Sequence, residues 1–430
     1  MKSYRKYCFL LIILLIILVS AGGIVSAASN DTATDEVKNV HSVKSDVTSS
    51  YPIKTGADEE KIADTNSGIG RIERNLKDAG QYPVIYVSSN ASNDNIGDSR
   101  DKPTTITNAV NNVEDGGSIY LITNSTSDRY QLNTSLYYSY KSFSIIGESS
   151  KNITLESTKS ELLHLYHSTI NITNINFINK DSATSAIYMV DSNVKINNCS
   201  FIGNTRNNYS SCIYASSSNV TINSTNFFNN SGVYGNIYSI SNTNMTLSYC
   251  LFENNTADMG GVIYSKNSQY NIKKSKFRYN TADYAGCLYL YNSKLESTDN
   301  LFENNVAEFY GGAIVSLENQ TISVKTSNFT KNNASTAGAI YAMYTPLTIT
   351  DSIFESNNAY TAGAVYSFNN TLSIQKSALL ANKRGDSIVH TLATKTCNLD
   401  NNWWGVNNPD FSVITDGVIP NAWLLMRLYN

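Results

Sequence analysis

Three acidic residues recur at a fixed place in a repeated sequence and are the first candidates for chemistry. Asp258, Asp283 and Glu308 each stand six residues after a phenylalanine. If successive repeats stack as neighbouring strands, the three carboxylates lie about 5 Å apart, a spacing that suits calcium or another cationic ligand. The alternative is a solvated turn, because the next two repeats place Ser335 and Tyr360 at this position.

Other groups that could take part in catalysis are dispersed along the chain. The four histidines are His41, His164, His167 and His390, and none lies in the repeats that contain the acidic column. Arg206, Arg278 and Arg384 are scattered, and no spacing suggests a Ser-His-Asp triad or a nucleophile elbow. The sequence therefore predicts a protein that is not an enzyme and needs no cofactor, with a polysaccharide lyase or hydrolase as the alternative.

A row of tyrosines is the second candidate site. It consists of Tyr188, Tyr214, Tyr238, Tyr264, Tyr289, Tyr341 and Tyr366, with Val315 in the one repeat that lacks the ring. The preceding residue is aliphatic in every repeat, and side chains alternate along a strand, so the rings are predicted on the outer face. Exposed tyrosines suit binding of glycans or proteins, because each combines apolar area with a hydrogen-bonding tip. The alternative is that stacked rings only stabilise the sheet.

These candidates belong to a repeat of about 25 residues. The phenylalanine column comprises Phe177, Phe201, Phe227, Phe252, Phe277, Phe302, Phe329 and Phe354, with Leu379 as a ninth member. An asparagine follows three residues later at Asn204, Asn230, Asn255, Asn280, Asn305, Asn332, Asn357 and Asn382. Three short strands and three turns per repeat predict an all-β, right-handed parallel β-helix of the pectate-lyase-like type. We expect the asparagines to adopt left-handed turn conformations and to hydrogen-bond from coil to coil.

The N-terminal part predicts export. Residues 1–27 place Lys2, Arg5 and Lys6 before an apolar run that ends in small residues, which is typical of a signal peptide. An uncleaved anchor is the alternative. Residues 28–80 are polar and almost free of aromatics, so they are predicted to form a disordered spacer. The protein is therefore expected to be secreted or held at the cell surface.

The β-helix is expected to span residues 81–411, with about twelve coils and a cover at each end. Apolar residues at helical spacing after Pro103 predict an N-terminal capping helix. Trp403 and Trp404 stand where the repeat stops and are expected to cover the last coil. Residues 412–430 then form a C-terminal tail.

The charge balance excludes one class of partner. Only 16% of the residues are charged, and the formal net charge is −3. A protein that binds nucleic acid needs clustered Lys and Arg, so no nucleic acid is expected. Cys199 and Cys250 share a column but lie two coils apart, beyond the reach of a disulfide, and are expected to fill space in the stack.

The repeat motifs resemble those of known surface proteins. "GGVI" (260–263) and "GGAI" (311–314), paired with "FENN", resemble the polymorphic outer membrane protein repeat of bacterial adhesins. The whole layout, with its "NNWWG" closing segment, resembles the adhesin-like surface proteins of methanogenic archaea. This resemblance implies a rod-like adhesin that binds cell-surface glycans, polysaccharide or surface proteins of other cells. Membrane contact is expected only through an uncleaved signal or an unseen anchor, and abundant Asn-x-Ser/Thr sites suggest glycosylation. A purely structural envelope component is the third possibility.

Overall fold

The structure is a computed structural model of the 430-residue chain. It describes residues 82–123, 127–148, 152–180, 183–206, 209–318, 320–382 and 387–426. The predicted signal peptide (1–27) and spacer (28–80) lie outside these residues. Within the described ranges, no helix has both the length and the apolar character needed to cross a membrane.

Three long parallel sheets run through the described residues, with a fourth short sheet beside them. Sheet A contains β1 (Tyr82–Val87), β2 (Val113–Leu121), β5 (Ser142–Gly147), β8 (Thr169–Thr173), β11 (Asn193–Asn197), β14 (Asn219–Asn223), β18 (Asn244–Ser248), β22 (Gln269–Lys273), β26 (Lys294–Thr298), β30 (Thr321–Lys325), β33 (Leu347–Thr350), β36 (Thr371–Gln375) and β39 (Thr396–Asn398). Sheet B contains β3 (Ser127–Leu132), β6 (Asn152–Ser157), β9 (Asn176–Asn179), β12 (Ser200–Ile202), β15 (Asn226–Phe228), β19 (Leu251–Glu253), β23 (Lys276–Arg278), β27 (Leu301–Glu303), β31 (Asn328–Thr330), β34 (Ile353–Glu355) and β37 (Ala378–Leu380).

The tyrosine row and the acidic column predicted from the sequence lie in the other two sheets. Sheet C contains β4 (Leu136–Ser139), β7 (Leu163–Tyr166), β10 (Ile187–Val190), β13 (Ile213–Ser216), β17 (Ile237–Ile240), β21 (Ile263–Lys266), β25 (Leu288–Tyr291), β29 (Ile314–Leu317), β32 (Ile340–Met343), β35 (Ala362–Phe368) and β38 (Ser387–Leu392). Sheet D contains β16 (Ser231–Gly232), β20 (Thr256–Met259), β24 (Thr281–Tyr284) and β28 (Val306–Tyr310).

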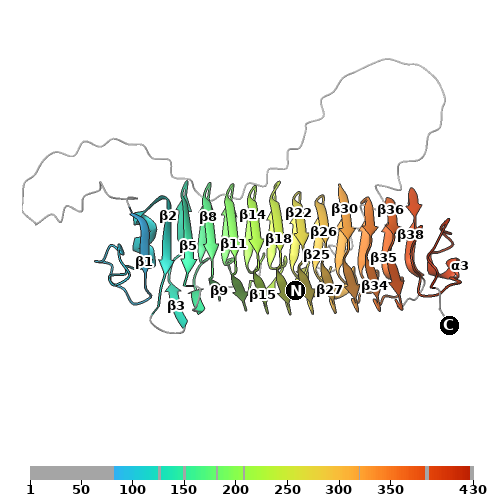
Figure 1. Ribbon diagram of the computed structural model, residues 1–430, viewed down its shortest axis with the longest axis horizontal. Helices are drawn as coiled ribbons and strands as arrows, with labels where there is room; N and C mark the ends of the chain where they lie inside the picture. The colour runs from blue at the N-terminus through green and yellow to red at the C-terminus, as the bar shows by residue number, and fades with distance from the viewer. Residues whose placement is uncertain are drawn as a thin grey trace, which may run out of the picture. The chain divides into compact units, whose positions relative to one another are not determined.

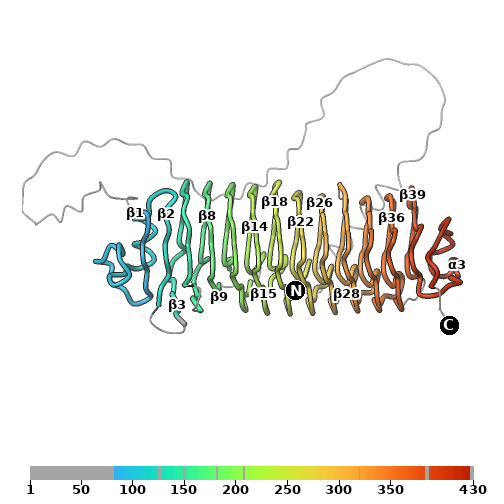
Figure 2. The backbone as a smooth tube through the Cα atoms, in the orientation of Figure 1, coloured from blue at the N-terminus to red at the C-terminus, as the bar shows by residue number. Residues whose placement is uncertain are grey.

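Each strand pairs in parallel with its counterpart one coil away, so the chain winds as a parallel β-solenoid (Figure 1). The backbone trace shows the coils side by side, in chain order from blue to red (Figure 2). The predicted fold class is confirmed, with about eleven turns where the sequence predicted about twelve.

The phenylalanine column lies inside the solenoid. Every ring from Phe177 to Phe354 is fully buried. Successive rings stack with centroids 4.6 to 4.9 Å apart, which is the spacing of neighbouring strands. A large apolar side chain is required in each coil, because a smaller one would leave a cavity between the rings above and below.

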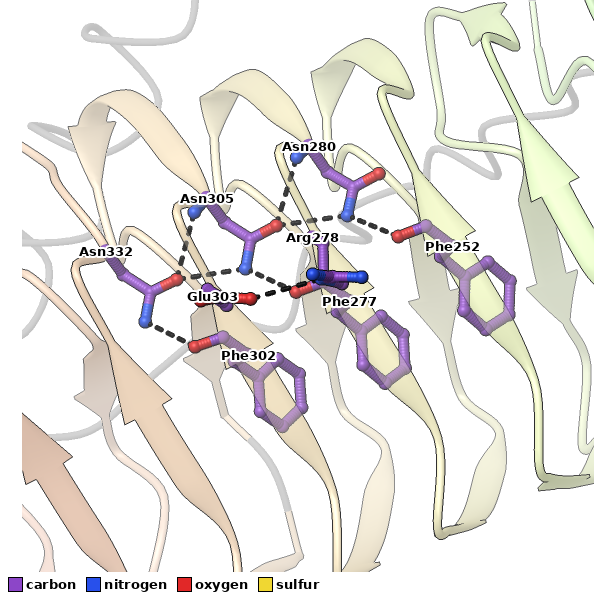
Figure 3. A network of polar contacts seen from close by, with 8 residues as sticks. All are labelled: Phe252, Phe277, Arg278, Asn280, Phe302, Glu303, Asn305 and Asn332. Carbon is purple, nitrogen blue, oxygen red and sulfur yellow. Dashed lines mark hydrogen bonds and ion pairs between the residues drawn. The ribbon is translucent and has the colours of Figure 1, made fainter.

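The asparagine column is a ladder of buried amides (Figure 3). The side-chain amide of Asn280 donates to Asn305 Oδ1 at 3.0 Å and to the carbonyl of Phe252 at 3.1 Å. The backbone N–H of Asn280 donates to the same Asn305 oxygen at 3.0 Å. The same side-chain bond to the next coil runs from Asn204 to Asn382, so the predicted hydrogen bonds between coils are confirmed.

The predicted left-handed conformation of these asparagines is wrong. The positive φ falls on the residue before each of them, at Gly203, Asn229, Asn254, Tyr279, Asn304, Lys331, Ser356 and Ala381. The asparagine is selected for its side chain, which satisfies two buried backbone groups of the preceding coil and bonds to the asparagine side chain of the next. The residue that bears the strained backbone varies in type, since its side chain does not have to fit the stack.

A column of glycines explains the "GG" and "AG" motifs. A Cβ on Gly286 would lie 2.1 Å from the carbonyl oxygen of Gly312, and the same clash with the next coil recurs at Gly261, Gly312 and Gly338. Only glycine allows the backbones to approach so closely. The residue before each of these four glycines has a φ near +60°. Glycine adopts this angle readily at Gly260 and Gly311, whereas it is unfavourable for Ala285 and Ala337.

Short helices lie near both ends of the solenoid. Helix α2 (Ile106–Asn112) follows Pro103 as predicted, begins at the N-cap Thr105 and buries apolar side chains against β1 and β2. Near the other end, Trp404 is buried against Phe411, the first residue of α3 (Phe411–Ile414). Trp403 instead pairs its backbone with Ala378 in the last coil.

Candidate functional site

The predicted tyrosine row lies on the outer face of sheet C. In β10, Ile187 and Met189 are buried while Tyr188 between them is half-buried. The seven tyrosines occupy one column in register from strand to strand. Most of these rings therefore point outward, as the alternation of side chains along a strand predicts.

The row is longer than the sequence indicated. Tyr137 and His164 continue it at one end and His390 at the other, because each pairs in register with its neighbour. We call these three residues and the seven tyrosines the aromatic row, which fills ten of the eleven strand positions of sheet C. The signal for the extra members is an apolar residue directly before each, at Leu136, Leu163 and Val389.

Four of the eight ring pairs along the aromatic row are stacked face to face. The ring centroids of Tyr188 and Tyr214 are 4.6 Å apart with an interplanar angle of 1°. Those of Tyr341 and Tyr366 are 4.9 Å apart with an interplanar angle of 4°. Rings stacked in this way cover each other's faces, so they present edges and hydroxyl groups outward. Tyr238 interrupts the stack, with angles of 81° to Tyr214 and 72° to its other neighbour in the row.

The middle of the aromatic row is buried. Tyr289 is only 4% exposed, and Val315 in the next coil is only 2% exposed. Tyr310 from β28 of sheet D lies 4.9 Å from Tyr341, beside the position where Val315 lacks a ring. The accessible aromatic row therefore consists of two stretches, Tyr137 to Tyr264 and Tyr341 to His390.

Burial raises the pKa of most phenols of the row. It raises the pKa of Tyr264 to about 12, and the nearby Tyr234 adds to the shift. The pKa values of Tyr214, Tyr238 and Tyr341 are raised further by the same burial and by neighbouring phenols. At neutral pH the tyrosines of the row present uncharged hydroxyl groups, each able to donate and accept hydrogen bonds.

A histidine beside a carboxylate lies at each end of the row. His164 Nδ1 is 2.8 Å from Glu161 Oε1, and the hydrogen bond between them lowers the pKa of Glu161. His390 Nδ1 is 2.7 Å from Asp416 Oδ2. Each imidazole also packs on a tyrosine of the row.

The predicted acidic column lies in sheet D. The pairing of β20 with β24 places Asp258 opposite Asp283, and β28 has one extra residue between Ala307 and Tyr310, in the stretch that contains Glu308. Among the described residues, no group of three or more His, Cys, Asp and Glu side chains is arranged to hold a metal ion. The calcium site therefore stays a prediction from the sequence.

Sequence reasoning missed a polar hollow on the outer face of sheet A. It has a volume of about 210 Å³ and is lined by Asn244, Thr246, Gln269, Asn271, Lys294 and Glu296 over the backbone of Met245 and Tyr270. These side chains come from β18, β22 and β26, in three successive coils. No signal in the sequence identifies the hollow, because it depends on side-chain sizes at positions about 25 residues apart.

Comparison with known proteins finds solved structures that are similar to this chain and shows no function. No family model and no curated protein matches the sequence. The pectate lyase Pel9A is similar in structure, at 12% identity and a TM-score of 0.40, over 75% of this chain and 80% of that chain. A rhamnogalacturonan lyase matches at 13% identity and a TM-score of 0.35, over 68% and 82%. The catalytic domain of a GH87 α-1,3-glucanase in complex with nigerose matches at 13% identity and a TM-score of 0.29, over 82% and 69%.

These comparisons correct the prediction that the protein is not an enzyme. That prediction depends on the dispersal of catalytic groups along the sequence, yet the three structures named above are carbohydrate-active enzymes with this type of fold. Stacking brings distant residues together, as it does Asn271 and Glu296, so dispersal in the sequence is no argument against a site. At about 12% identity the fold is shared and an activity is not transferred.

Proposed function

We propose that the protein is an exported, polysaccharide-active β-solenoid that holds extended glycan chains along the aromatic row. The observation that carries this proposal is the row itself, with aromatic rings in ten of eleven strands of one outer face. Partly exposed aromatic side chains in such number are uncommon without a ligand.

The chemistry of the row favours a polysaccharide. From Tyr188 to Tyr264, a hydroxyl-bearing ring recurs about every 4.8 Å, the separation of neighbouring strands. An extended glycan also repeats its hydroxyl groups along its length, so it meets a similar partner in coil after coil. Contacts that are weak singly become strong when many are made by one chain. Tyr238, which is turned across the stack, packs on Tyr209 and Tyr234 and so widens the aromatic surface at this point of the row.

The experiment compares two triple variants of the full chain. The first is Tyr188→Ser, Tyr214→Ser and Tyr264→Ser, in the accessible part of the row. The matched control is Tyr249→Ser, Tyr279→Ser and Tyr360→Ser, three exposed tyrosines outside the row. Retention on a panel of soluble and insoluble polysaccharides is scored together with new reducing or unsaturated chain ends. We expect retention to fall at least about tenfold in the row variant only, the loss of about 1.4 kcal/mol of binding. Equal retention by the two variants would exclude the row.

The same assay separates the forms that this function can take. New chain ends would assign a polysaccharide lyase or hydrolase. Retention without products, on polysaccharide and on whole cells, would assign the adhesin that the repeat motifs resemble. If neither retention nor product is found on any polysaccharide or cell, the structural envelope component replaces the proposal.

A further inference from the structure

The hollow on sheet A differs in chemistry from the rest of that face. In the column that contains Asn271 and Glu296, the two strands before Asn271 hold Thr221 and Thr246, and the three strands after Glu296 hold Ser323, Thr348 and Ser373. Larger polar side chains return only farther away, at Asn171 and Lys195 on one side and Asn398 on the other. An amide next to a carboxylate occurs in this column only at β22 and β26 among these strands. The hollow is therefore a local feature that the repeat does not require.

Its polar groups suit a neutral ligand. Lys294 Nζ lies 2.8 Å from Glu296 Oε1, so the one cation and the one anion of the lining offset each other. The remaining side chains are three amides and a hydroxyl. Together they offer donors and acceptors on several sides without a net charge. The volume of about 210 Å³ is many times the space that one water molecule needs.

One buried atom points to a missing partner. Asn271 Oδ1 is shielded from solvent and accepts no hydrogen bond. A buried polar atom without a partner is unfavourable, so a donor that reaches it stabilises the complex. The Asn271 side chain as a whole is half-buried and lines the hollow, so rotation of its amide exposes this oxygen to a ligand there. A sugar hydroxyl can then supply the donor while its neighbouring hydroxyl groups reach the lysine and the carboxylate.

We propose that this hollow binds one neutral sugar residue through Asn271, Lys294 and Glu296. The site lies on sheet A, whereas the aromatic row lies on sheet C, and it does not depend on the row. Loss of binding at one face therefore leaves the other unchanged, and the two proposals fail separately.

The test is calorimetric titration of the full chain with glucose, galactose, mannose and their disaccharides, with galacturonate and inorganic phosphate as charged comparisons. We expect one site that prefers a neutral sugar and loses affinity about tenfold in Asn271→Ala. The matched control is Thr348→Ala, in the same column two strands beyond the hollow, and it should bind like the unaltered chain.

A second variant tests the neutral character of the site. Glu296→Gln keeps a hydrogen-bonding group of the same size but leaves Lys294 without its anion. We expect galacturonate to gain affinity relative to the neutral sugars in this variant. The proposal is overturned if no neutral sugar of the panel binds, if Asn271→Ala binds as well as the unaltered chain, or if the unaltered chain prefers galacturonate or phosphate.

Discussion

The asparagine column and the aromatic row each repeat one kind of side chain in almost every coil, yet they have opposite environments. The asparagines are at most 7% exposed, and each amide from Asn204 to Asn357 donates to the next asparagine and to a phenylalanine carbonyl. In the row, most rings are half-exposed. Within the part of the chain that the structure describes, the hydroxyls of Tyr188, Tyr214 and Tyr238 form no hydrogen bond.

This difference separates columns that build the solenoid from columns that are free to bind. A buried polar side chain must be satisfied inside the protein, so its geometry is uniform and its substitution affects stability. A half-exposed side chain keeps hydrogen-bonding capacity for a ligand, and its geometry can vary from coil to coil. Repetition in the sequence does not by itself distinguish the two.

The largest effect is expected at the glycine column. In Gly286→Ala, the new Cβ would lie 2.1 Å from the carbonyl oxygen of Gly312, so the coils must separate. We expect a loss of about 4 kcal/mol in the free energy of unfolding, measured by denaturant titration. The control is the neighbouring Ala285→Gly, which relieves a residue with a φ of +60° and should stabilise the protein by about 1 kcal/mol. Equal and small effects of the two changes would contradict the close approach.

The next largest effect is expected in the asparagine column. Asn280→Ala removes the acceptor of both the backbone N–H and the side-chain amide of Asn255. Two buried donors lose their partner, and we expect a loss of about 3 kcal/mol in the same titration. Asn244→Ala, on the exposed face of sheet A, is the matched control and should change stability by less than about 0.5 kcal/mol. A similar small change in Asn280→Ala would show that the ladder does not stabilise the coils.

The sequence predicts a feature when that feature requires the same type of side chain in every coil. The phenylalanine and asparagine columns were predictable because stacking demands the same side chain in every coil. The left-handed position beside the asparagines was not, since it constrains a backbone angle that Tyr279, Lys331 and Ala381 can all adopt. The hollow escaped prediction because it requires a combination of unlike side chains from three coils.

The interruption of the aromatic row at Val315 tests whether a repeated side chain is by itself enough to make a binding surface. Val315→Tyr completes the row in sequence, but this position is only 2% exposed and Tyr310 lies beside the adjoining ring. We expect about 2 kcal/mol of destabilisation from overpacking and no gain in polysaccharide retention. The reverse change, Tyr341→Val, removes stacking with Tyr366 and should cost about 1 kcal/mol. A Val315→Tyr protein that is more stable and better retained would show that the row is uniform after all.

The smallest effect is confined to alkaline solution and follows from the pKa of Tyr264, which burial raises from 10.0 to about 12. Because the folded-state pKa is raised, the contribution of this phenol to stability is fully present below pH 10 and is lost as the pH rises through about 12. Tyrosinate absorbance and the denaturation midpoint, followed over this range, should show unfolding coupled to ionisation. Tyr264→Phe removes the titrating hydroxyl and should weaken the alkaline loss, whereas Tyr249→Phe, an exposed tyrosine outside the row, should leave it unchanged. If both variants lose stability with pH as the unaltered chain does, the ionising groups lie elsewhere and the phenols of the row are less buried than their stacking implies.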